Sequence, residues 1–99
     1  MNPGREQSLP LSIAIASGTG TGTLSKVWTI CRWIRVIPVA ETDSFDVTIK
    51  DSDGYIMFTR TGQIGTLAER IEMSCGIMAT ITIANATQDG VFRARLDLH

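Results

Sequence analysis

Hydrophobic and polar residues alternate along most of this chain, and a period of two is typical of β-strands. Residues 45–50 show it most clearly, because Phe45, Val47 and Ile49 fall on one side of an extended backbone. The polar residues between them fall on the other side. This segment is predicted to be a strand with one buried face.

Two segments near the C-terminus alternate in the same way. The first places Ile77, Ala79, Ile81 and Ile83 on one face, and the second places Phe92, Ala94, Leu96 and Leu98 opposite Arg93, Arg95 and Asp97. Both are predicted strands. Ser8 to Ser17 alternates more weakly, and Pro10 there favours an edge position or a strand start.

Lys26 to Val39 is the longest apolar run, and it carries large apolar side chains on both faces. Trp28, Ile30, Ile34 and Val36 share one face, and Val27, Cys31, Trp33 and Ile37 share the other. We expect a strand that is covered on both faces for part of its length, or that is bent by a bulge, and that ends at Pro38.

The remaining segments are shorter or ambiguous. Tyr55 to Arg60 is a predicted short strand, whereas Leu67 to Met73 fits either a strand or a helical turn. Gly18 to Thr23 fits either a flexible loop or a flat strand with few side chains. Asp51 to Gly54 and Asn85 to Gly90 have the residues of hairpin connections.

These elements predict an all-β fold. We expect a small antiparallel β-sandwich or barrel of six to seven strands, with an extended N-terminal arm. The arm covers residues 1–10 and the single sandwich domain covers residues 11–99. The prolines and glycine of the arm suit a segment that lies across a neighbouring subunit.

The length and net charge of the chain limit the kinds of partner that it is expected to bind. A chain of 99 residues, 43% hydrophobic, buries only about two-thirds of its unfolded surface, so a partner that covers more of it would add stability. A net charge of −1 argues against a nucleic-acid binder. Cations prevail in Gln7–Ala40 and acids in Glu41–Tyr55, which indicates either a solvated surface or docking of subunits through opposite patches.

No apolar run is long enough to span a membrane, and no signal peptide is evident at the N-terminus. Membrane insertion and secretion are therefore not expected. Cys31 and Cys75 are too few for a disulfide scaffold. They are either buried free thiols or a bond between two strands.

The residues for catalysis or metal binding are absent from the expected places. His99 is the only histidine and the last residue, where it lacks a rigid mount for a triad. Asp51-x-Asp53-Gly54 resembles the start of a calcium loop, but Gly62 stands where the bidentate Glu is needed. The Gly/Thr stretch lacks the Lys-Ser/Thr of a phosphate loop. We predict no enzyme activity, no metal and no cofactor.

Trp28 and Trp33 lie beside Arg32 and Arg35, and an aromatic ring next to cations suits several roles. Both rings fit the core, one of them fits an interface anchor, and a stacking platform for sugar or single-stranded nucleic acid is the third alternative.

Two hairpin segments carry a family resemblance. The first is Ser44-Phe45-Asp46-Val47-Thr48-Ile49-Lys50-Asp51-Ser52-Asp53-Gly54, and the second is Ile81-Thr82-Ile83-Ala84-Asn85-Ala86-Thr87-Gln88-Asp89-Gly90-Val91-Phe92-Arg93-Ala94-Arg95-Leu96. Together they resemble segments of small β-rich structural proteins of tailed bacteriophages. The resemblance implies a virion component: a capsid decoration or cement protein, or a small head or tail piece, made in the host cytoplasm.

That resemblance implies contacts with other copies of the chain and with a major capsid or other virion protein, and none with nucleic acid or membrane. The residues expected at the interface are Pro3, Leu9, Pro10, Trp28, Arg32, Trp33 and Arg35. The chief alternative is a ligand-binding sandwich, an adhesin or carbohydrate-binding module, that uses one of the tryptophans and a loop carboxylate. An enzyme built on Asp51 and Asp53 is the third.

Overall fold

The computed structural model describes residues 7–23, 29–75 and 79–98, and the side chains of residues 11–23, 32–71 and 79–96. This part of the chain forms eight strands: β1 (Gln7–Ile15), β2 (Gly20–Thr23), β3 (Thr29–Ile37), β4 (Ser44–Lys50), β5 (Ile56–Ile64), β6 (Leu67–Cys75), β7 (Thr80–Ala84) and β8 (Gly90–Leu98). It contains no helix long and apolar enough to cross a membrane.

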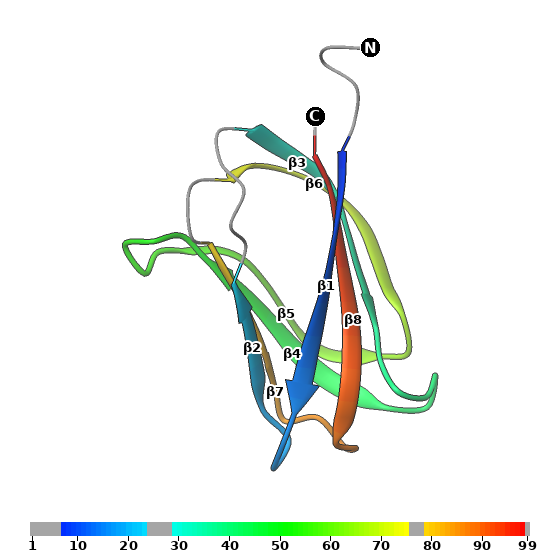
Figure 1. Ribbon diagram of the computed structural model, residues 1–99. Helices are drawn as coiled ribbons and strands as arrows, with labels where there is room; N and C mark the ends of the chain where they lie inside the picture. Colours follow the sequence, from blue (N-terminus) through cyan, green and yellow to red (C-terminus); the bar gives the residue numbers. More distant parts are fainter. Residues whose placement is uncertain (1–6, 24–28, 76–78, 99) are drawn as a thin grey trace.

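The strands form two antiparallel sheets of four, which make the two layers visible in Figure 1. The first sheet has the order β1-β8-β3-β6 and the second β2-β7-β4-β5. β1 pairs with β8, β2 with β7, β3 with β6 and β4 with β5. The chain is thus a long antiparallel ribbon, folded at the β4–β5 hairpin and rolled into two layers, which is the jelly-roll form of the β-sandwich.

The core lies between the sheets and is built from the alternating positions found in the sequence. Phe45, Val47 and Ile49 of β4 are buried, as predicted, and Phe92 and Leu96 of β8 are buried opposite them. The rings of Phe45 and Phe92 meet edge to face, with centroids 5.1 Å apart and planes at 82°. This contact joins the second sheet to the first, and its geometry is one that aromatic pairs favour.

Other expectations are confirmed in detail. Leu67 to Met73 lies in a strand, β6, and not in a helical turn. The register of β3 against both of its neighbours shifts between Cys31 and Trp33, which is the predicted bulge. Pro10 lies on β1, an edge strand of the first sheet. The choice between free thiols and a bond for Cys31 and Cys75 stays open, because their side chains lie outside those that the structure describes. Their partners in the register are Met73 and Thr29.

Two expectations need correction. The number of strands is eight instead of six to seven, because Gly20–Thr23, which we left open as a loop or a flat strand, is β2. The boundary of the arm also changes, since β1 begins at Gln7 and pairs residues 7–10 with β8. Residues 1–6 lie outside the described part of the chain.

The turn between β1 and β2 explains why β2 is rich in glycine. Ala16 and Thr19 exchange backbone hydrogen bonds around Ser17 and Gly18, whose positive φ angles of 54° and 78° are those of a type I′ turn. β2 then runs so close to β1 that a Cβ atom on Gly20 would lie 2.3 Å from the carbonyl oxygen of Ala14. Only glycine fits there, because backbone cannot move aside.

We therefore expect Gly20→Ala to lower the free energy of unfolding by about 1–3 kcal/mol, the usual cost of overpacking. Gly22→Ala should cost less, because its added Cβ would meet the mobile Leu11 Cδ2 atom, at 2.6 Å, instead of backbone. Urea denaturation of the two variants measures the difference. Equal losses, or no loss for Gly20→Ala, would contradict the close approach.

Candidate functional site

The outer face of the first sheet carries a cluster of arginines from two strands. Arg35 of β3 and Arg95 of β8 are direct partners in the register, and Arg93 stands opposite Ile37. All three arginines are exposed, while the residues that alternate with them are buried in the core. The alternation of β3 and β8 therefore delivers three guanidinium groups to one surface.

A depression of about 430 Å³ lies on this surface, within the size range of small-ligand sites. β1 contributes to its rim through Ser12, which is paired with Arg93 in the register. Its lining consists of Leu11, Ser12, Arg35, Ile37, Arg93, Ala94 and Arg95. Among the side chains that the structure describes, the lining contains cations, a hydroxyl group and apolar atoms but no carboxylate, so its chemistry suits an anionic group.

Trp33 lies on the same strand as Arg35, two residues away and on the same face. Its side chain is 42% exposed, and Ile37 at the other side of Arg35 is 36% exposed. Tryptophan and arginine side chains that lie close together are typical of binding hot spots in protein interfaces. We call this surface, defined by Trp33, Arg35, Ile37, Arg93 and Arg95, the arginine face.

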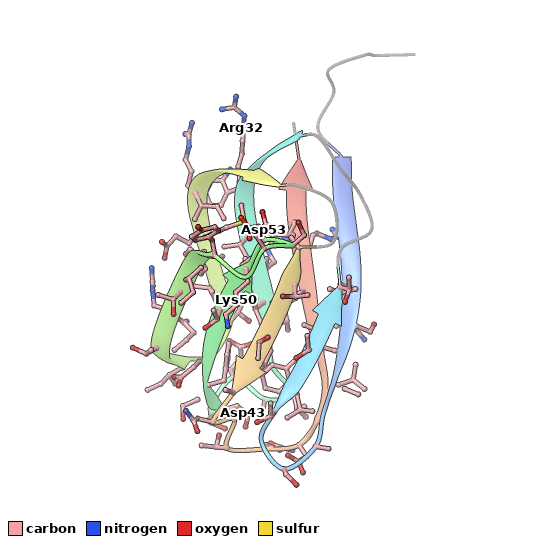
Figure 2. The ribbon with its side chains drawn as sticks, turned by 90° about the vertical axis from the view of Figure 1, so that its left-hand side faces the viewer. Arg32, Asp43, Lys50 and Asp53 are labelled. Atoms are coloured by element: carbon pink, nitrogen blue, oxygen red, sulfur yellow. The ribbon has the colours of Figure 1, made fainter. Side chains whose placement is uncertain are left out.

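The structure brings together only some of the residues predicted for an interface. Trp33 and Arg35 lie on the arginine face. Arg32 lies at the β3 bulge and projects from one end of the sandwich (Figure 2). Leu9 and Pro10 lie in β1, opposite Leu96 and Arg95, so they belong to the sheet and not to an arm. Pro3 and Trp28 lie outside the described residues.

Arg93, Arg95 and Ile37 are members of the face that we did not predict as interface residues, and the two arginines matter most for its charge. The sequence placed them on the polar side of a strand, which is where the structure has them. Their pairing with β3, about sixty residues earlier in the chain, is what turns two surface arginines into a cluster. The available signal was the repeat Arg-x-Arg on the outward side of a strand.

Most of the carboxylates whose side chains the structure describes accept hydrogen bonds that hold loops in place. Asp89 accepts hydrogen bonds from the Ser17 and Gly18 N–H groups at 3.0 and 2.8 Å, and so holds the β1–β2 turn. Asp43, at the lower end of the sandwich in Figure 2, is buried and accepts one from the Ala40 N–H at 2.9 Å. These carboxylates are parts of the fold.

Hydrogen bonds of this kind lower the pKa of two carboxyl groups, those of Glu41 and Asp46. The Thr66 hydroxyl and N–H both donate to Glu41, and they lower the pKa of that carboxyl from 4.5. The Gly62 N–H and the Asn85 side-chain amide donate to Asp46, and they lower its pKa from 3.8. In each case hydrogen bonds to the ionised form favour it over the protonated form.

Asp51, the first residue of the calcium-like motif, is also engaged. Its Oδ1 atom accepts hydrogen bonds from the N–H groups of Asp53 and Tyr55, at 2.9 and 3.0 Å. The carboxylate thus stabilises the β4–β5 hairpin. In the part of the chain that the structure describes, no three His, Cys, Asp or Glu side chains gather in a way that could hold a metal ion.

No protein-family model matches the chain, and a search of curated proteins finds no relative. The fold and the arginine face define a small jelly roll that presents a cationic surface with apolar neighbours.

The lowered pKa values predict how stability depends on acid. A carboxyl whose pKa is lower in the folded state contributes stability above its unfolded pKa, and loses it as the pH falls through the folded value. Stability should therefore be full at neutral pH and decline as the pH falls below about 4.5, and Glu41→Gln and Asp46→Asn should each make that decline shallower. Denaturation midpoints measured across the acid range test this.

Asp53→Asn is the matched control for the acid experiment. Asp53 is exposed on the hairpin, and its carboxylate makes no hydrogen bond to the described residues. We expect this variant to follow the wild-type acid profile. If Glu41→Gln and Asp46→Asn followed it as well, the two ties would not contribute to acid stability.

The engagement of Asp51 predicts that calcium does not stabilise this fold. Thermal melts with added calcium and with a chelator should overlay. A melting temperature lower by more than about 5 °C with the chelator, which is on the order of 1 kcal/mol for this size, would identify a cation site. Asp51→Asn should then abolish the difference.

Proposed function

We propose that this protein is a non-enzymatic structural component of a bacteriophage particle, and that it attaches to a larger assembly through the arginine face. The role is that of a capsid decoration or cement protein, or of a small head or tail component. Its partners are other copies of the chain and a major capsid or other virion protein. It would be made in the host cytoplasm and found in the virion.

The observation that carries the proposal is the exposure of Trp33 and Ile37 beside the arginines of one sheet face. Tryptophan and arginine are the residues most enriched among those that dominate binding energy at protein interfaces. A face of this composition supports docking onto another protein surface. The two hairpin segments that resemble phage structural proteins supply the kind of assembly.

The fold agrees with the proposal but does not decide it. Jelly rolls serve as viral capsid domains and also as lectins and other ligand-binding proteins, so function has to be argued from a site. The main alternative remains a ligand-binding module, such as an adhesin or a carbohydrate-binding domain. The depression on the arginine face is the observation that favours it.

Trp33→Ala tests the attachment. We expect the variant to fold, because Trp33 lies outside the core, and to lose about 2 kcal/mol or more of association free energy, as interface anchors do. Binding to capsids assembled from a capsid protein encoded beside this gene measures the loss, and sedimentation of the protein alone measures self-association.

Tyr55→Ala is the control variant for this experiment. Tyr55 is 72% exposed on the β4–β5 hairpin, away from the arginine face, and its removal should leave attachment unchanged. The proposal fails if Trp33→Ala attaches as well as Tyr55→Ala. It also fails if the gene has no virion gene beside it and the purified chain stays monomeric while binding a sugar on a glycan array.

A further inference from the structure

The three arginines of the depression are crowded in a way that the fold does not need. Arg35 and Arg95 face each other directly across β3 and β8, and like charges in that position destabilise a sheet. Among the described residues, no carboxylate lies within ion-pair distance of Arg35, Arg93 or Arg95. The unfavourable pairing is relieved when an anion enters the depression between them.

The charges around the cluster do not change its sign. Arg70 of β6 is exposed and pairs with Trp33 in the register, so it adds another cation beside the three arginines of the depression. Asp97 follows Arg95 by two residues on β8 and pairs with Trp33 from the other side. The described side chains of β3, β6 and β8 that share this face include no carboxylate.

A second copy of this chain is a poor occupant of the depression, so the proposed contacts between copies would use other surfaces. A two-fold symmetric contact sets the same patch against itself, which would bring these arginines against their own counterparts. A head-to-side contact would need several free carboxylates on the other copy. Glu41, Asp46, Asp51 and Asp89 are instead hydrogen-bonded within their own chain. Among the side chains that the structure describes, the exposed Asp53 is left with a free carboxylate, and one carboxylate does not match three guanidinium groups.

Nucleic acid is a poor occupant as well. Binding to a phosphate backbone depends on many neutralised phosphates and on a strongly cationic domain. This chain has a net charge of −1, and three of its nine cationic residues line one compact depression. A short-range contact with a few anionic groups fits this arrangement better than a polyanion does.

We propose that the depression binds carboxylate side chains of an acidic segment of a different protein. Arginine guanidinium groups pair with carboxylates through two parallel hydrogen bonds, and the three guanidinium groups would receive two or more acidic residues. Ile37 and Trp33 beside them would contact an apolar residue of the same segment. This inference rests on the proposed function, since it names the partner chemistry of the same face.

The first experiment measures binding of fluorescein-labelled octaglutamate, with an oligothymidylate of equal charge as the second probe. The wild type should bind octaglutamate at low ionic strength, and Arg35→Gln/Arg95→Gln should weaken binding about tenfold or more, since hydrogen bonds to charged groups are worth that much. Lys50→Gln removes one cation from the other sheet and should change binding less than about twofold.

Each other outcome overturns the inference. Absent binding of octaglutamate would do so, and an equal loss in Lys50→Gln would show that only net charge matters. Tighter binding of the oligothymidylate, weakened by the same double substitution, would assign the face to nucleic acid. Because no virion protein is present, a positive result stands even if attachment to capsids fails, so the two proposals are tested separately.

The second experiment needs no ligand. If Arg35 and Arg95 repel each other in the free protein, Arg95→Gln should raise the melting temperature by about 1–4 °C, whereas Lys50→Gln should not. A rise would show that the fold does not need the Arg35–Arg95 pair, as the proposed binding role requires. A lower melting temperature for Arg95→Gln would mean that the arginines support the sheet, and it would overturn the inference.

Discussion

Between Ile15 and Gly20 the chain leaves the first sheet and enters the second, and the two layers close at this corner through backbone that lies in contact with backbone. The Cβ atom missing from Gly20 is what allows β2 to pass the Ala14 carbonyl. Asp89, from the loop that leads into β8, holds the turn by both of its oxygens. β1 lies over the core in the first sheet and β2 lies over it in the second, and this corner joins the two.

Much of the fold is predictable from the sequence, because strands with one buried face record that face in their own residues. Phe45, Val47 and Ile49 alternate with polar residues, and they are the buried side of β4. β2 escapes the same reasoning, since its inward positions are Gly20 and Gly22 and carry no apolar signal. What selects glycine there is the nearness of β1, a tertiary fact that no local pattern contains.

The candidate site also has one part that the local sequence predicts and another part that depends on tertiary pairing. Trp33 and Arg35 are neighbours in the sequence, so their association with one surface could be predicted from alternation alone. Arg95 joins them only through the pairing of β8 with β3, and that register depends on the whole roll. The acidic residues show the converse, because their number suggests a charged surface while the structure uses Glu41 and Asp46 to fix loops.

Each of the four edge strands of the two sheets is short or irregular. Pro10 removes a donor from β1, β2 is only four residues long, and the registers of β5 and β6 shift against their inner neighbours. Interrupted borders discourage the addition of a foreign strand, which is the usual route to open-ended fibres. All four edge strands of the two sheets are therefore poor templates for pairing with another chain.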